Sequence, residues 1–272
     1  MTSPASVVEY VDTHCHPVLL GDSGLLDAAW ESCSEHRVTQ VISVGLNLED
    51  SDRNRQMAES RSGVFFTVGW HPHETLPPDA AQVRALDELL GHPRAVAVGE
   101  IGLDLYFRPG YHETTFENQM TSINIMMELA QTHAKPVVIH SRDAHLETLT
   151  ALAAWPAVKG VMHCFSGTAE FSKQCMDLGY VPSFSGIVTF GSAKDIQGAA
   201  VSVADGEYLV ETDAPFLAPV PMRGKSNLPG YVAHTAAGIA RLRQQPVEEV
   251  ALQTTRRARS LFGLGDTDLL PT

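Results

Sequence analysis

Residues of the types that bind metal ions occur at intervals along this 272-residue chain, and each follows a short apolar segment. They are His14, His16, Glu100, His140, His163 and Asp213. His14 and His16 lie two residues apart, so in an extended chain both imidazoles point to the same side and could reach one ion. Such a pair also occurs in ordinary polar loops. The other four donors favour the metal site, because chance rarely places ligand-type residues behind so many apolar segments.

The number and type of these donors indicate which ions they suit. Nitrogen and oxygen donors without thiolate fit zinc, magnesium, manganese and similar divalent ions. Six donors exceed the four of a tetrahedral ion, so we expect two divalent ions that share a carboxylate. Glu100 is the bridge we expect, since none of the five lysines ends a predicted strand and could serve in its place.

The elements that must position these side chains are short apolar runs that alternate with helical segments. Eight runs are predicted strands: Val7–Asp12, Gln40–Val44, Val64–Val68, Ala95–Gly99, Pro136–Ile139, Gly160–His163, Tyr180–Ser183 and Tyr208–Val210. Apolar residues at helical spacing predict helices over Leu25–His36, Asp79–Leu90, Glu113–Thr132, Asp143–Ala154 and Ala169–Leu178. Two further helices, broken near Pro246, are predicted between Val232 and Phe262.

Eight strands with intervening helices predict the α/β class and a (β/α)8 TIM-type barrel, in one domain over residues 1–272. The carboxyl ends of barrel strands meet at one rim, so the six donors would converge there. The alternative is an open doubly wound sheet, which needs a glycine-rich phosphate loop after the first strand. The chain instead has Asp12-Thr13-His14-Cys15-His16-Pro17 at that place.

The net charge, the apolar runs and the cysteines exclude several classes of protein. A formal net charge of −13 excludes a passive cationic surface for duplex DNA, so any nucleic acid must be held at a local site or through bound cations. There is no apolar run long enough for a membrane span, and no basic segment followed by an apolar one at the start. Four cysteines without a C-x-x-C pair do not form a disulfide framework. We therefore expect a cytoplasmic enzyme with no membrane association and no obligate protein partner.

Seven motifs occur in order over nearly the whole chain. They are Val11-Asp12-Thr13-His14-Cys15-His16, Val68-Gly69-Trp70-His71-Pro72-His73, Val98-Gly99-Glu100-Ile101-Gly102-Leu103-Asp104, Pro136-Val137-Val138-Ile139-His140-Ser141-Arg142-Asp143-Ala144, His163-Cys164-Phe165-Ser166-Gly167, Glu211-Thr212-Asp213-Ala214-Pro215 and Pro221-Met222-Arg223-Gly224-Lys225-Ser226-Asn227. As a set, they make the sequence resemble the TatD family of metal-dependent deoxyribonucleases, within the wider metallo-dependent hydrolase barrels.

The resemblance implies a barrel that hydrolyses phosphodiester bonds. It also implies two ligand sets, which are His14, His16, Glu100 and Asp213 for one ion and Glu100, His140 and His163 for the other. His71 in the G-x-H-P-H motif would lie close to the substrate. We expect a metal-activated water to attack DNA or a short oligonucleotide at strand ends, with Asp213 and Glu100 as catalytic groups and His71 steadying the phosphoryl oxygens.

The remaining polar residues carry weaker expectations. Arg223 and Lys225, in the predicted loop after the eighth strand, are predicted phosphate contacts, since barrels often bind phosphate there. Arg142 is equally compatible with a phosphate contact and with pairing to a neighbouring acid. Glu211 is expected to orient a ligand, whereas His73 is expected to be an exposed turn residue.

Three further expectations concern the nucleic acid and the alternatives to a nuclease. Unpaired bases would stack on Trp70, Tyr106 or Phe107. A metal-dependent hydrolase of amides, lactones or small phosphoesters is the main alternative, because the same rim serves many chemistries. A metal-dependent scaffold without activity is the other, and six converging donors argue against it.

Overall fold

The computed structural model describes residues 8–106 and 108–271, and eight parallel strands form its centre. They are β1 (Tyr10–Cys15), β2 (Val38–Ser43), β3 (Val64–Val68), β4 (Ala95–Asp104), β5 (Val137–Arg142), β6 (Gly160–Met162), β7 (Tyr180–Phe184) and β8 (Leu209–Val210). Each strand pairs with the next in the chain. A bridge between Cys15 and Ala214 links β1 to the segment after β8, and the Asp213 N–H donates to the His14 carbonyl at 2.9 Å. The sheet is therefore a nearly closed barrel, as the sequence predicts.

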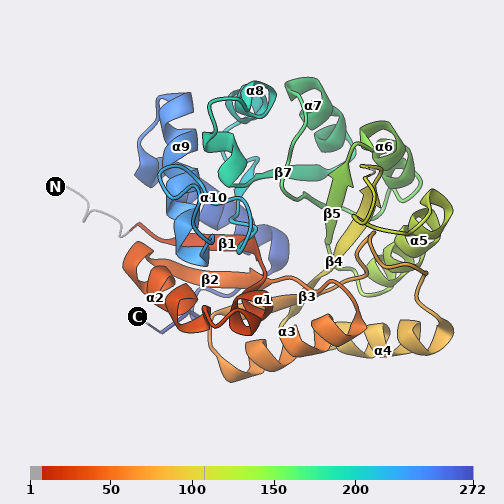
Figure 1. Ribbon diagram of the computed structural model, residues 1–272. Coiled ribbons are helices and arrows are strands. Elements are labelled where there is room, and N and C mark those ends of the chain that lie inside the picture. Colours follow the sequence, from red (N-terminus) through yellow and green to blue (C-terminus); the bar gives the residue numbers. More distant parts are fainter. Residues whose placement is uncertain (1–7, 107, 272) are drawn as a thin grey trace.

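Helices surround the strands (Figure 1). The α-helices are α1 (Pro17–Asp22), α2 (Leu26–His36), α3 (Leu48–Ser60), α4 (Ala80–Leu90), α5 (Phe116–Thr132), α6 (His145–Ala153), α7 (Ala169–Asp177), α8 (Lys194–Ser202), α9 (Val232–Arg243) and α10 (Val247–Phe262). Two short 3-10 helices, η1 (Gly186–Thr189) and η2 (Pro229–Tyr231), lie between the later elements. No helix in the described part of the chain is long and apolar enough to cross a membrane.

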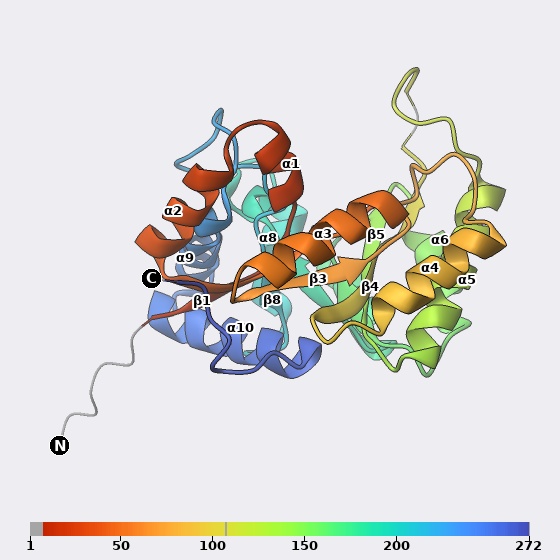
Figure 2. The ribbon, with the colours of Figure 1, turned by 90° about the horizontal axis from the view of Figure 1, so that it is seen from below.

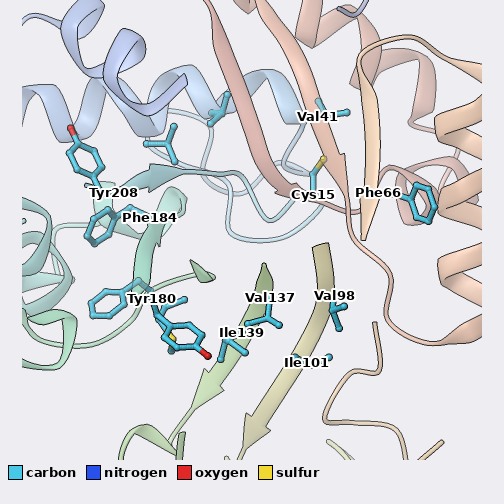
Figure 3. Packing of buried hydrophobic residues seen from close by; sticks show 14 of the residues in the cluster. Cys15, Val41, Phe66, Val98, Ile101, Val137, Ile139, Tyr180, Phe184 and Tyr208 are labelled. Carbon is cyan, nitrogen blue, oxygen red and sulfur yellow. The ribbon is translucent and has the colours of Figure 1, made fainter. Parts of the chain in front are cut away.

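The strands bury apolar side chains on both faces, which explains their continuous apolar sequences. One cluster contains a residue from every strand: Val11, Ile42, Phe65, Val96, Val138, Val161, Val181 and Leu209. These fill the barrel interior, and Phe262 of α10 packs against them. Figure 2 shows α10 on one side of the strands and α1 on the other. A larger cluster, part of which is drawn in Figure 3, includes Val41, Val98, Ile139 and Phe184.

The predicted strands match the observed ones best where the apolar run is sharply bounded. β3 has the predicted limits, whereas β4 continues five residues beyond the predicted end at Gly99 and so carries Glu100 within the strand. The predicted first strand, Val7–Asp12, begins outside the described residues and ends too early, because β1 extends to Cys15. The polar residues Asp12 to His14 are buried within β1. A prediction that relies on apolar residues therefore ends the strand at the first of them.

Three helices are absent from the prediction. α1 is only six residues long, and α8 has a short apolar face. α3 has thirteen residues, but the side chains that it buries are Ser51, Asn54 and Ala58. Its buried face is held by hydrogen bonds, such as the one from the Gly69 N–H to Ser51 Oγ at 3.2 Å. A search for apolar spacing therefore misses it.

Replacement of a buried aromatic side chain tests this account of the core. Phe184→Ala should lower the free energy of unfolding by about 3–5 kcal/mol, since Phe184 is fully buried and the change leaves a cavity. Phe116→Ala is the matched control, because Phe116 is 47% exposed and should change stability by about 0.5 kcal/mol or less. Urea denaturation measures both values. Equal effects of the two substitutions would contradict the core assignment.

Candidate metal centre

Successive side chains of a strand point alternately into the barrel and outward, and this alternation places polar side chains above the apolar interior. Residues two apart on a strand point to the same side. His140 follows the interior residue Val138 by two positions, and His163 follows Val161 in the same way. These imidazoles therefore point inward at the carboxyl ends of the strands, where the sequence predicts them.

The pairing of β4 with β5 sets a second part of the geometry. Glu100 and Asp104 lie four residues apart on β4, and Gly102 between them pairs with His140. Only glycine fits here, because its φ is +149° and an added Cβ would lie 2.0 Å from the His140 carbonyl oxygen. His140 Nδ1 contacts Glu100 Oε1 at 2.8 Å, and its Nε2 contacts Asp104 Oδ2 at 3.1 Å. The register thus seats this imidazole between two carboxylates.

Four buried donors form the first ligand-type cluster. The Nε2 atoms of His14 and His16 are 3.3 Å apart, and His16 Nε2 is 3.4 Å from Asp213 Oδ1. His14 Nε2 lies 3.5 Å from Glu100 Oε2 and 3.7 Å from Asp213 Oδ1. Ligands held at 2.0–2.1 Å around a tetrahedral zinc ion are separated by about 3.3–3.4 Å. The separations in this cluster, from 3.3 to 3.7 Å, are close to that value, so its side chains are compatible with one such ion.

The second cluster uses the other oxygen of Glu100. Glu100 Oε1 lies 2.8 Å from His140 Nδ1, 3.1 Å from His163 Nε2 and 3.4 Å from His71 Nε2. The candidate ligand atoms of Glu100, His140 and His163 lie within 4.8 Å of one another, as do those of His14, His16 and Asp213. Because Oε2 faces one cluster and Oε1 the other, Glu100 has the arrangement of a bridging carboxylate.

A further carboxylate lies behind each imidazole of the second cluster. Asp104 contacts the outer nitrogen of His140, and Glu211 Oε1 contacts His163 Nδ1 at 3.1 Å. The Cys164 N–H also donates to Glu211 Oε1 at 2.7 Å, which fixes this oxygen. Such partners orient metal-binding histidines and make them more basic. Glu211 therefore has the orienting position that the sequence predicts for it.

Electrostatics keeps the carboxylates ionised in spite of their depth. Burial alone raises the pKa of Glu100, but His163 and His71 bring it well below its usual value. Burial likewise opposes ionisation of Asp213, and its hydrogen bond with His16 lowers its pKa below the usual range. Burial raises the pKa of Cys164 to about 12, so this thiol next to His163 remains protonated.

His71 lies at the edge of the second cluster in a defined protonation state. Burial lowers its pKa to about 4, so its imidazole is neutral at neutral pH. Its Nδ1 accepts a hydrogen bond from the His73 N–H at 3.1 Å, which places the remaining proton on Nε2. His71 can therefore donate one hydrogen bond from Nε2.

The three predicted phosphate contacts are exposed, and the two arginines among them lie over aromatic rings. Arg142 lies with its guanidinium carbon 3.9 Å from the Tyr106 ring centroid, and it donates to the Tyr111 hydroxyl. Arg223 lies 4.2 Å above the Phe190 ring, and Lys225 is exposed in the same loop after β8. Arg142 thus contacts tyrosines instead of an acid. All three remain available to an anion.

Two expectations about exposed rings are wrong. Trp70 is 5% exposed and donates from Nε1 to the Leu76 carbonyl, so no base can stack on it. His73 is no solvated turn residue, since its Nε2 lies 2.8 Å from the buried Asp104 Oδ2. Tyr106 is covered by Arg142 on one face, and Phe107 lies outside the described residues.

Two residues of the site gain importance only in the structure. Asp104 contacts His140 and His73, although its place in the Gly102-Leu103-Asp104 motif gives it no role in the sequence analysis. Its position at the carboxyl end of a strand could have identified it. Phe216 is 51% exposed and packs edge-on against His16 with ring centroids 6.1 Å apart. Its proximity to Asp213 in the sequence was the available signal.

Comparison with known proteins gives the family. The family model described as "TatD related DNase" matches residues 11–263. The chain belongs to this TatD-related family. This TatD-family chain is 34% identical over 256 residues to the "Uncharacterized metal-dependent hydrolase YabD" of Bacillus subtilis, across 92% of the chain and 98% of the relative. Its motifs therefore predict the family correctly.

Two further similarities concern a named nuclease and a solved structure. The TatD-family chain is 31% identical over 231 residues to the "3'-5' ssDNA/RNA exonuclease TatD" of Klebsiella pneumoniae, across 82% of the chain and 86% of the relative. The crystal structure of YjjV, a TatD homolog from Escherichia coli, matches with a TM-score of 0.87 at 27% identity, covering 95% and 99% of the two chains. The protein is a metal-dependent hydrolase of the TatD family.

Removal of the charge behind His163 tests the role of the orienting carboxylate. Glu211→Gln should weaken zinc binding by about 10- to 100-fold, since metal affinity depends on such partners. Competition with a chromogenic chelator measures the affinity. Glu207→Gln is the control, because Glu207 pairs with Arg257 at the surface, with 3.0 Å between their charged atoms. The same affinity in both variants would contradict the assignment.

Proposed function

We propose that this TatD-family hydrolase cleaves phosphodiester bonds of DNA or short oligonucleotides, acting at strand ends with two divalent ions such as zinc, magnesium or manganese. The observation that carries the proposal is the position of Glu100, whose two oxygens face two separate ligand-type clusters. His14, His16 and Asp213 complete one set of ligands, and His140 and His163 complete the other. The similarity to a named exonuclease supports nucleic acid as the substrate.

Two ions in such a centre neutralise phosphate charge and lower the pKa of a bound water toward about 7. Asp213 is the residue that we assign to accept a proton in the reaction. Its carboxylate is ionised, and its side chain retains 13% exposure, whereas the side chain of His14 has none. Among the candidate ligands of its cluster, Asp213 is thus the one that faces the open rim.

The chain's own residues orient the phosphate. The Nε2–H of His71 points toward Glu100 and can donate to a phosphoryl oxygen there without adding a charge. Arg142 lies on the β5 side of the centre, and Arg223 and Lys225 lie in the loop after β8. Charge-assisted hydrogen bonds from these groups would hold the phosphates on either side.

Charge and exposed apolar groups favour a short or frayed strand over long duplex. The net charge of −13 repels duplex DNA, so binding depends on the centre and on these few cations. Phe216 offers an exposed ring next to His16, on which an unpaired base could stack. The same ring would be of little use to a paired base.

Metal removal tests the proposed reaction. Protein stripped with a chelator should not shorten a labelled single-stranded DNA oligonucleotide, and added Mn2+, Mg2+ or Zn2+ should restore cleavage. Asp213→Asn should reduce the turnover of the restored enzyme by about 100-fold or more, as expected for loss of a proton acceptor. Its circular dichroism should match that of the parent, because the barrel core lies below the rim.

Persistent cleavage after exhaustive chelation would contradict the proposal. Assays with carboxylic esters, lactones and amides distinguish the main alternative. Metal-dependent turnover of one of these substrates, with no cleavage of any oligonucleotide, would assign the same centre to a different bond.

Truncation of a rim cation tests the phosphate contacts. Arg223→Ala should reduce kcat/KM on the oligonucleotide by about 10- to 100-fold, which corresponds to about 1.5–3 kcal/mol for one charge-assisted contact. Bound metal should not change, because a guanidinium has no free lone pair for a metal. Arg256→Ala, an exposed arginine of α10, serves as the control. Unchanged activity in the Arg223 variant would show that this side chain is merely solvated.

A further inference from the structure

A second group of ligand-type side chains lies beside the Glu100 centre. His73 follows β3, Asp104 ends β4, and His112 belongs to the loop between β4 and α5, which projects beyond the strands in Figure 2. The candidate ligand atoms of these three residues lie within 4.8 Å of one another. We propose that they bind a divalent cation of their own, in addition to any ion bound at Glu100.

Asp104 provides the fixed anionic ligand. It is fully buried, and its Oδ1 accepts a hydrogen bond from the Tyr106 N–H at 3.0 Å. Three groups converge on the other oxygen, Oδ2: His73 Nε2 at 2.8 Å, His140 Nε2 at 3.1 Å and the Tyr111 hydroxyl at 3.3 Å. A buried carboxylate with this surplus of partners suits a cation.

His112 is the group that the hydrogen bonds leave unexplained. Both of its ring nitrogens are shielded from solvent, and neither has a hydrogen-bond partner among the described residues. Its ring lies nearly parallel to that of His73, with centroids 4.9 Å apart and an interplanar angle of 27°. Shielded polar atoms without partners are costly, and coordination of an ion by one nitrogen would remove that cost at the bound atom.

The alternative group of His71, His73 and His140 is less suited to an ion of its own. The candidate ligand atoms of these three side chains also lie within 4.8 Å of one another. However, His71 Nδ1 accepts the His73 N–H, and its Nε2 faces Glu100. Both nitrogens of His140 already contact carboxylates. Asp104 and His112 therefore make the better partners for His73.

The proposed site is distinct from the Glu100 centre, although His140 touches both. Asp104 contacts the nitrogen of His140 that faces away from Glu100. Two imidazoles and one carboxylate match the ligands that zinc takes with an open fourth position. Tyr111, which contacts Asp104, also contacts Arg142, so the cation would lie next to this arginine.

Zinc titration in the absence of nucleic acid tests the site. Metal-free protein is titrated with Zn2+ against a chromogenic chelator, and bound zinc is counted by elemental analysis. His112→Ala should bind one equivalent fewer than the unsubstituted protein. His112→Gln, which keeps a polar side chain of similar size, should show the same loss. Circular dichroism establishes that both variants are folded.

His133→Ala is the matched control. His133 follows α5 and contacts Asp87 of α4 at 2.7 Å, outside both groups of candidate ligands, so this change should leave the zinc count unchanged. Equal stoichiometry and affinity in the unsubstituted protein and both His112 variants would overturn the proposal. The measurement involves no substrate, so its result is separate from the question of whether the protein cleaves DNA.

Discussion

A single buried carboxylate, Glu100, is the interaction on which the whole site depends. It is 3% exposed, and an ionised carboxylate at that depth is unfavourable unless positive or hydrogen-bonding groups surround it. The imidazoles of His71, His140 and His163 face one oxygen, and His14 faces the other. They come from the ends of β1, β3, β5 and β6. The nearly closed barrel brings these four strand ends to one side chain, so the site depends on the arrangement of the whole sheet.

The barrel separates stability from chemistry. Apolar residues from all eight strands fill its interior, whereas the polar donors lie above them at the carboxyl ends. Behind the donors, Asp104 and Glu211 restrain the imidazoles that Glu100 alone could not orient. On the proposed function, cations bound at the rim would reverse the local charge there and let an acidic chain bind an anionic substrate.

The sequence allowed the barrel to be predicted, and also the convergence of six ligand-type side chains at its rim, because both depend on local patterns; their role as metal ligands remains a prediction. Apolar runs mark strands covered on both faces, and a histidine or acid after each run marks the rim. The sequence did not predict α3, which buries Ser51 and Asn54 in place of apolar residues. Nor did it predict the contact of His73 with Asp104, since the register of β4 against β5 and the return of the loop with His112 are tertiary features.

Anomalous X-ray scattering from crystals of the protein loaded with Mn2+ or Zn2+ tests the central claim most directly. At the Glu100 centre we expect two strong peaks about 3.5–4 Å apart, with Glu100 between them and with His14, His16 and Asp213 on one and His140 and His163 on the other, whatever the occupancy of the separate His112 site. A single peak at the Glu100 centre, or peaks that leave Glu100 uncoordinated, would contradict the shared-carboxylate centre.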